Sequence, residues 1–463
     1  MNDSLERKIA TRQARVCVIG LGYVGLPLAV ELARVGFAVT GLDTNAARVA
    51  ALSRGESYIG DVAGDDLRAV VQGGRLHATA DYAALKGADV IFICVPTPFT
   101  AARAPDLSFV LGAARGIATH LRRGQLVVLQ STTYPGTTED EVLPILESSG
   151  LKAGVDFHLA FSPERINPGD RQHTVRNTPK VVGGLTRQCA ELAAGVLAHL
   201  HPIVRIVSSP RAAEMTKLLE NIYRSVNIAL VNEMALLCER MGIDVWEVIE
   251  AASTKPFGFM PFYPGPGVGG HCIPVDPYYL LWKAREYDFH TKFIELAAEV
   301  NQEMPYHVVA RIAEALNARG KTICGARILL LGVAFKKDVD DARNSPAERI
   351  AELLLARGAD LRYNDPHIPR FSVGGDVFYP TQVVLESVPL TREALRGADC
   401  VVILAAHSAY DFAWIVGESP LIVDAVNATR GTEGGAEKVW RIGAPHVGRA
   451  DGEEGSQAAR RQG

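Results

Sequence analysis

The sequence predicts an α/β protein with two Rossmann-like, doubly wound domains, joined by a long central helix in a helical dimerisation domain. Three observations lead to this prediction. Short apolar, β-branched runs alternate with helical stretches near both ends of the chain, as in a parallel sheet. A Gly-x-Gly-x-x-Gly pattern follows the first of these runs. Between the two regions, residues 214–241 contain no Gly or Pro and carry apolar residues at helical spacing.

The N-terminal alternating region begins with a predicted strand at residues 16–19. Three glycines and a helical pattern extending to about Arg34 follow it. Further strands are predicted within the apolar segments 37–43, 87–98 and 124–133. This order is typical of a dinucleotide-binding domain.

A similar pattern recurs in the C-terminal region. We predict a strand within 326–335, a helix over 345–357, and strands within 359–365, 397–407 and 421–426. Asp43 and Asp365 close matching strands, and Gly-Ala-Asp opens both the segment at Gly87 and the segment at Gly397. These parallels favour a second domain of the same architecture, although any two α/β units look alike at this level.

The central helix, at 1.5 Å per residue, would be about 42 Å long. We expect it to bridge two domains and to form a dimer contact; a plain core helix is the alternative. The expected organisation is an NAD-binding domain over 1–210, a central helical domain over 211–318 and a UDP-binding domain over 319–445. The polar, Gly-rich tail over 446–463 is expected to be disordered.

Composition excludes several classes of protein. The 463 residues are 48% hydrophobic and 22% charged, with a net charge of −4, which argues against a chain-wide footprint for nucleic acid. No apolar run reaches the roughly 18 residues of a membrane span, and the polar start lacks a secretory signal. The seven cysteines show no CxxC spacing, so no metal is expected and the cytoplasm is the expected compartment.

The glycines after the first strand predict a cofactor loop. Gly20 permits the tight turn, Gly22 lets the backbone approach a pyrophosphate, and Gly25 permits close packing of helix on strand. The amides near Tyr23 and Val24 would face the phosphates at the positive end of the helix.

A strand-terminal acid strengthens this prediction. Asp43 lies about twenty residues further on, where it would accept the ribose hydroxyls and repel a 2′-phosphate, favouring NAD over NADP. The alternative is a tight turn with no cofactor.

A Gly- and Pro-rich segment, residues 262–281, contains Cys272 with Asp276 four residues later. A thiol on such a loop can attack an aldehyde, and the thiohemiacetal can then release a second hydride to leave a thioester for water to hydrolyse. The alternative is an inert loop thiol. Lys217, Asn221 and Arg224 share one face of the predicted helix, which a merely solvated face would also explain.

Seven separated motifs in order resemble those of the UDP-glucose/GDP-mannose dehydrogenase family, and the resemblance covers residues 15 to about 430. They lie at 20–29, 95–98, 131–137, 161–165, 214–221, 265–277 and 335–343. The sequence around SPER and the approach to the cysteine are most similar to the UDP-N-acetylglucosamine 6-dehydrogenase subgroup.

The resemblance implies an NAD-dependent, four-electron oxidation of the C6 primary alcohol of a UDP-sugar to a carboxylate, through a cysteine thiohemiacetal and thioester. It implies polysaccharide biosynthesis as the role and a homodimer or larger homo-oligomer as the assembly. UDP-glucose and UDP-N-acetylmannosamine stay open as substrates. A two-electron hydroxyacid dehydrogenase and a non-enzymatic nucleotide-binding regulator are the competing hypotheses.

The resemblance also implies roles for single residues. Cys272 matches the nucleophile, Lys217 and Asn221 the groups that hold the reacting oxygen, and Asp276 and Glu164 the acids that manage protons, with Thr132 holding a water or the cofactor. The matching substrate contacts are Glu164, Arg165, Ile166, Lys217, Asn221, Arg224, Gly269, Phe335 and Lys336. The matching NAD contacts, besides the glycine loop and Asp43, are Arg48, Thr97, Thr132 and Arg343.

Two positions depart from the family pattern. Family members commonly carry Arg at the position of Phe257, and a basic residue at the position of Val426. Lys255 and Arg430 are the cations near these positions. Both departures bear on substrate affinity and sugar choice.

Overall fold

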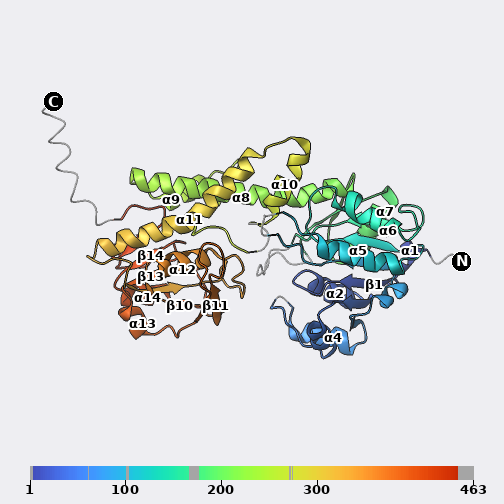
Figure 1. Ribbon diagram of the computed structural model, residues 1–463, viewed down its shortest axis with the longest axis horizontal. Coiled ribbons are helices and arrows are strands. Elements are labelled where there is room, and N and C mark those ends of the chain that lie inside the picture. Colours follow the sequence, from blue (N-terminus) through green and yellow to red (C-terminus); the bar gives the residue numbers. More distant parts are fainter. Residues whose placement is uncertain are drawn as a thin grey trace. The chain divides into compact units, whose positions relative to one another are not determined.

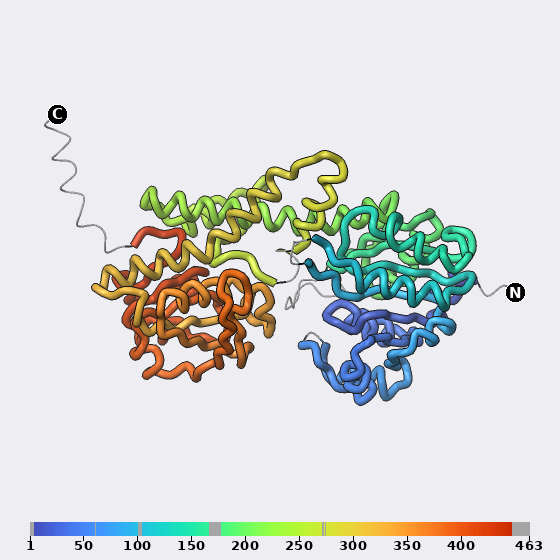
Figure 2. Tube along the Cα trace, in the orientation of Figure 1, coloured from blue at the N-terminus to red at the C-terminus, as the bar shows by residue number. Residues whose placement is uncertain are grey.

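The computed structural model describes residues 4–60, 62–100, 104–165, 177–270, 273 and 275–446. Its contacts divide the chain into two compact units. The first comprises Met1–Asn221 with Val275–His290, and the second comprises Ile222–Pro274 with Thr291–Gly463. The colours of Figure 2 follow the chain through both units. The predicted tail lies outside the described residues from position 447 onward, as do Ile166 and Cys272.

An eight-stranded sheet forms the centre of the first unit. All neighbouring strands pair in parallel except β6 and β7, which are antiparallel. The predicted doubly wound sheet is confirmed, and four strands that were not predicted extend it, one at the β3 edge and three beyond β5. In sheet order the strands are β3 (Leu76–Thr79), β2 (Ala38–Leu42), β1 (Arg15–Ile19), β4 (Val90–Ile93), β5 (Leu126–Leu129), β6 (His158–Phe161), β7 (Lys180–Gly184) and β8 (Val204–Val207).

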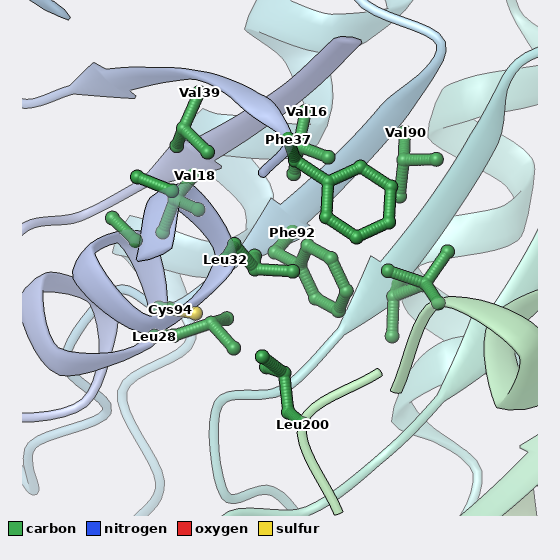
Figure 3. Close-up of a cluster of buried hydrophobic side chains, with 14 of the residues drawn as sticks. Val16, Val18, Leu28, Leu32, Phe37, Val39, Val90, Phe92, Cys94 and Leu200 are labelled. Carbon is green, nitrogen blue, oxygen red and sulfur yellow. The ribbon is translucent and has the colours of Figure 1, made fainter. Parts of the chain in front are cut away.

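Strand residues of the first unit alternate between two cores because successive side chains point to opposite faces of a sheet. Val16 and Val18 pack with α2 and α7 on one face, whereas Cys17 and Ile19 pack with α5 and α6 on the other. Figure 3 shows the first of these cores, with Phe37 and Phe92 near its centre. The helices are α1 (Leu5–Ala10), α2 (Gly25–Arg34), α3 (Ala46–Ser53), α4 (Gly64–Gln72), α5 (Ser108–His120), α6 (Leu143–Glu147), α7 (Arg187–Leu197) and α10 (Asp276–Ala284).

The second unit contains a five-stranded parallel sheet. Helices α11 and α12 cover one face, and α13 and α14 cover the other (Figure 1). The sheet order is β10 (Asp360–Asn364), β9 (Arg327–Leu331), β13 (Cys400–Ile403), β14 (Ile422–Asp424) and β15 (Val439–Arg441), beside an antiparallel pair, β11 (Arg370–Val373) and β12 (Val383–Glu386). The helices are α9 (Val245–Ser253), α11 (Lys292–Asn317), α12 (Pro346–Ala356), α13 (Arg392–Gly397) and α14 (Phe412–Glu418).

The long helix α8 (Pro210–Met241) has 32 residues and begins earlier than the prediction from residue 214. Pro210 is compatible with the first helical position because the amide that it lacks would have no partner there. Ser209 caps this end by accepting a hydrogen bond from the Ala212 amide. The boundary between the two units falls within α8, after Asn221. No helix in the described ranges is long and apolar enough to cross a membrane.

The repeated Gly-Ala-Asp motif has the same structural role in both sheets. The carboxylate of Asp89 accepts the backbone N–H of Arg15 at 2.9 Å, at the start of β1. The carboxylate of Asp399 accepts the backbone N–H of Arg327 at 2.8 Å, at the start of β9. Each acid therefore joins the amino ends of two neighbouring strands, β1 and β4 in the first sheet and β9 and β13 in the second.

Candidate active site

The three glycines of the predicted cofactor loop meet three different surroundings. Gly20 has a φ of +89°, and a Cβ there would lie 2.7 Å from the carbonyl oxygen of Cys94. A Cβ at Gly25 would lie 1.8 Å from the carbonyl oxygen of Gly20, so the helix and the turn touch directly. At Gly22 no described atom lies within 4 Å of a Cβ position. The opening at Gly22 fits the approach of a pyrophosphate to the start of α2.

Asp43 is buried at the end of β2 beside this loop. Its Oδ2 accepts the Leu21 amide at 2.9 Å and its Oδ1 accepts the Asn45 amide at 2.8 Å. The guanidinium of Arg48 lies 3.4 Å from Oδ2 and faces the ring of Tyr58. Because each carboxylate oxygen offers two lone pairs, Asp43 can still accept a ribose hydroxyl. The loop and the acid therefore fit an adenine dinucleotide.

The loop that follows β5 lies at the same edge of the sheet. Glu214, fully buried on α8, accepts the amides of Gly136 and Thr138 and the Thr138 hydroxyl at 2.7–2.9 Å. Thr132 is half-buried within this loop, and Thr97 is buried after β4 with its carbonyl accepting the Tyr279 hydroxyl. Glu214 thus ties α8 to the loop that contains Thr132.

Two candidate residues of α8 are deeply buried. Lys217 is 7% exposed and Asn221 is 2% exposed, so the solvated-face alternative is wrong for both. Asn221 donates a hydrogen bond of 2.5 Å to Asp276, which is also buried and begins α10. The structure therefore brings together an ammonium, an amide and a carboxylate within the first unit.

Glu164 follows β6 and meets two polar side chains that the sequence did not indicate. Its Oε2 accepts Lys180 Nζ at 2.8 Å and Gln130 Nε2 at 2.9 Å. Arg165, the next residue, pairs with Glu220 of α8, with its Nη2 2.6 Å from the glutamate. Glu164 is therefore held by residues from two further strands of the sheet.

Candidate residues in the second unit gather around the loop after β9. A Cβ at Gly269 would lie 2.8 Å from the Asn344 carbonyl oxygen and 2.8 Å from Phe335 Cβ. The amide of Gly270 donates to the Arg343 carbonyl at 3.0 Å. The guanidinium of Arg343 pairs with Asp341, 2.6 Å away. Lys336 is half-buried beside Phe335, and Arg224 is half-buried on α8. The end of the glycine-rich segment is thus docked on this loop.

A buried histidine braces the same loop. His407 Nδ1 accepts the Asp338 amide at 2.9 Å, which leaves Nε2 to donate to Asp365 at 3.1 Å. Asp365 also accepts the amides of Val333 and Ala334, as Asp43 accepts that of Leu21. Burial opposes ionisation of Asp365, but these hydrogen bonds outweigh it and hold its pKa below the usual value.

The same histidine belongs to a group that could hold a metal ion. Ligand atoms of Asp338, His367 and His407 lie within 4.8 Å of one another. However, the Nδ1 lone pair of His407 already accepts the Asp338 amide. A metal at this nitrogen would have to displace that hydrogen bond, so the group fits a structural network better than a metal site.

Cys272, the predicted nucleophile, and Ile166 lie outside the described residues, so their roles stay predictions. Among the other cysteines, Cys17 and Cys400 are buried, and burial raises the pKa of each to about 12. Burial also raises the pKa of Cys94. These thiols are therefore inert as nucleophiles near neutral pH.

The first unit therefore combines a loop that fits a dinucleotide with buried polar groups on α8 and after β6. A nicotinamide dehydrogenase needs both, a bound cofactor as hydride acceptor and side chains that can handle a proton. This combination defines a nicotinamide-dependent dehydrogenase.

The chain belongs to the UDP-glucose/GDP-mannose dehydrogenase family. The NAD-binding domain of that family matches residues 14–201, its central domain 211–303 and its UDP-binding domain 329–431. The protein is therefore an NAD-dependent oxidoreductase that dehydrogenates a UDP-sugar, as the sequence predicted.

Matches to named relatives extend over most of the chain. It is 39% identical over 359 residues to a UDP-N-acetyl-D-glucosamine 6-dehydrogenase of Pseudomonas aeruginosa, covering 77% of this chain and 84% of the relative. It is 37% identical over 394 residues to a UDP-N-acetyl-D-mannosamine dehydrogenase of Pyrococcus horikoshii, covering 85% and 89%. The solved structure of a UDP-D-ManNAc dehydrogenase from Pyrococcus horikoshii matches with a TM-score of 0.82 at 33% identity, covering 93% of this chain and 99% of that one.

Proposed function

We propose that the protein oxidises the C6 primary alcohol of UDP-N-acetylglucosamine to the carboxylate, with two NAD⁺ reduced for each sugar. The buried group of Lys217, Asn221 and Asp276 carries this proposal. An ammonium and an amide on one rigid helix can stabilise an oxygen that gains negative charge, and the carboxylate can receive its proton.

The reaction would consume one water and release three protons as the alcohol becomes a carboxylate. NAD⁺, held by the glycine loop and Asp43, would supply the hydride acceptor for each of the two oxidations of C6. After the first, the Cys272 thiolate adds to the aldehyde carbon, and the resulting oxyanion would be held by Lys217 and Asn221. After the second, water displaces the sulfur from the thioester, with Glu164 accepting the proton of the water.

Each unit has its own proposed binding residues. In the first unit, Asp43, Arg48, Thr97 and Thr132 would contact the cofactor, while Arg165 would contact the substrate. In the second unit, the docking of Gly269 on Phe335 supports a substrate role for the loop after β9, where Lys336 supplies a cation for the diphosphate. The further proposed contacts are Ile166 and Arg224 for the substrate and Arg343 for the cofactor.

The choice of sugar rests on the relatives. Two UDP-N-acetyl-D-glucosamine 6-dehydrogenases are among them, and so are several UDP-N-acetyl-D-mannosamine dehydrogenases. We therefore propose a UDP-N-acetylhexosamine rather than UDP-glucose as the substrate. UDP-N-acetylmannosamine is the alternative substrate, and the experiment below tests it directly. The two cations near the positions that depart from the family pattern each have a neighbour. Arg430 pairs with Glu250, and the Nζ of Lys255 lies 4.9 Å from the centroid of the Phe257 ring.

A second copy of the chain is the proposed partner of α8. Leu230, Met234, Leu237 and Met241 are spaced by three or four residues and are 37–61% exposed. Such a stripe on one face of a helix is what a helix-to-helix dimer buries. We propose a homodimer, and functional domains over 1–210, 211–318 and 319–445.

The test compares UDP-N-acetylglucosamine, UDP-N-acetylmannosamine and UDP-glucose and counts the NADH formed per sugar consumed. We expect the highest kcat/KM with UDP-N-acetylglucosamine, two NADH per sugar and a uronic acid product. One NADH per sugar with an accumulating aldehyde or ketone would contradict the four-electron reaction. We also expect Cys272→Ser to abolish release of the acid while NAD binding persists.

A further inference from the structure

We propose that Lys180 is a positioning residue for the last chemical step, the buried counter-ion that orients Glu164 and keeps it ionised as the base for thioester hydrolysis. This inference rests on the proposed function. It concerns a lysine that no sequence motif indicated.

The geometry around Glu164 is closely defined. Lys180 is 1% exposed, and its Nζ donates to Glu164 Oε2 and to the Pro163 carbonyl, both at 2.8 Å. Gln130, also 1% exposed, donates to the same Oε2 at 2.9 Å. The Arg165 amide donates to Oε1 at 2.7 Å. Two donors thus fix Oε2 and a third fixes Oε1, so the orientation of the Glu164 carboxylate is set by these three hydrogen bonds.

The topology of the sheet brings these groups together. Gln130 follows β5 and Glu164 follows β6, so both lie at the edge where parallel strands end. Lys180 is the first residue of β7, which runs antiparallel to β6. The reversal brings the amino end of β7 to the same edge, which is how a lysine enters this buried position.

The pair is costly if its only role is structural. Burial lowers the pKa of Lys180, while the Glu164 carboxylate acts in the opposite direction and the charge of Lys217 lowers it further. Apolar residues often replace a buried ion pair without loss of stability. The pair gains a chemical purpose because the Glu164 side chain is 16% exposed, so water can reach this carboxylate while Lys180 stays buried.

The step that Lys180 would support is hydrolysis of the acyl-enzyme. Water oxygen bonds to the thioester carbon, the C–S bond breaks, and Cys272 leaves as a thiolate. One water proton passes to Glu164, and the second is released when the product acid ionises; no electrons are transferred. Without the lysine cation, protonation of the partly buried carboxylate becomes easier, and a protonated Glu164 cannot act as the base.

The experiment compares Lys180→Met and Lys180→Arg with the wild type, and with Lys152→Met as an exposed control. Rapid mixing with substrate follows the first turnover, and mass spectrometry after acid quenching detects the acyl-enzyme. For Lys180→Met we expect two NADH per site at the wild-type rate, followed by turnover slowed by about 100-fold with the thioester accumulating. The acidic limb of the kcat profile should move to higher pH, and Lys180→Arg should restore both properties.

Other outcomes would overturn the inference. In a folded Lys180→Met variant, a wild-type turnover rate would exclude the role. The role would also be excluded if the rate of forming the first two NADH fell as much as the steady-state rate and the pH profile did not move. If Lys180→Met fails to fold, Lys180→Gln takes its place, since it also removes the charge. Wild-type turnover with an unmoved pH profile in Lys180→Gln would overturn the inference. Wild-type enzyme yielding one NADH per sugar would instead refute the proposed function itself.

Discussion

Asn221 donates a hydrogen bond to the carboxylate of Asp276, which is 55 residues further along the chain. The bond joins the middle of α8 to the first residue of α10 and uses one of the two N–H groups of the amide. The second N–H stays able to donate to a substrate oxygen. Asp276 thus orients the amide that we expect to contact the reacting oxygen.

Replacing Asn221 by Ala should lower kcat by roughly 10²–10³-fold, because the developing oxyanion loses one preoriented donor. Steady-state kinetics with saturating NAD would measure the loss. Asn227→Ala is the matched control, since the Asn227 side chain donates to the Tyr223 carbonyl of its own helix. Equal activity in the two variants would exclude Asn221 from the reaction.

Substitutions at two glycines of the cofactor loop should have different effects on NAD binding and on stability. Gly25→Ala brings a Cβ to 1.8 Å from the Gly20 carbonyl oxygen, so we expect the free energy of unfolding to fall by about 1–3 kcal/mol. NAD binding should weaken as well, because the loop is distorted. Gly22→Ala meets no described atom within 4 Å, so we expect an unchanged Tm with weakened NAD binding. Calorimetric NAD titration and thermal unfolding test both. Unchanged NAD affinity in Gly22→Ala would contradict the pyrophosphate site.

Asp399 should make stability depend on pH. The Arg327 guanidinium, the Lys321 ammonium and the Arg327 amide hold the pKa of Asp399 well below its usual value. A carboxyl whose pKa is lower in the folded state stabilises the protein above its unfolded pKa of about 3.9, and this contribution is lost as the pH falls below that value.

Asp399→Asn should therefore cost about 1 kcal/mol at pH 7, mainly through the weakened hydrogen bonds at the start of β9. The difference from wild type should shrink below about pH 4. Denaturant unfolding across pH 3–8 measures it, with the exposed Glu386→Gln as control. A difference that stays constant with pH would refute the assignment.

His407 should affect the substrate more than the cofactor. His407→Phe removes the acceptor for the Asp338 amide and the donor to Asp365. We expect KM for the UDP-sugar to rise about tenfold, as for the loss of a buried hydrogen bond of about 1.4 kcal/mol, with KM for NAD unchanged. Addition of a chelator should leave wild-type KM unchanged. A rise in KM for both substrates would contradict this localisation.

Local patterns predicted the elements that local chemistry determines. The strand, glycine turn and helix of the cofactor loop follow from spacing alone, and so does the shared helical face of Lys217 and Asn221. The burial of Lys217 and Asn221 could not be predicted from the sequence, because the spacing of residues on a helix does not tell which face another element covers. Helix α8 begins at Pro210 rather than at residue 214, because a proline is compatible with the first turn of a helix.

The partners of Glu164 could not be found in this way. Lys180 and Gln130 come from strands on either side of β6, and only the antiparallel direction of β7 brings Lys180 to the same edge. The sequence signal for Lys180 is a lysine immediately before two valines, Val181 and Val182. A single charged residue there is more commonly a solvated strand end, so the pattern gave no reason to single it out.

The first unit is assembled from two pieces of chain, Met1–Asn221 and Val275–His290. During synthesis the ribosome must therefore release the whole intervening segment before the second piece can join the first. A fragment ending at Asn221 would lack both Asp276 and Tyr279, which bond to Asn221 and to the Thr97 carbonyl. An isolated nucleotide-binding module would need residues 275–290 reattached through a short linker.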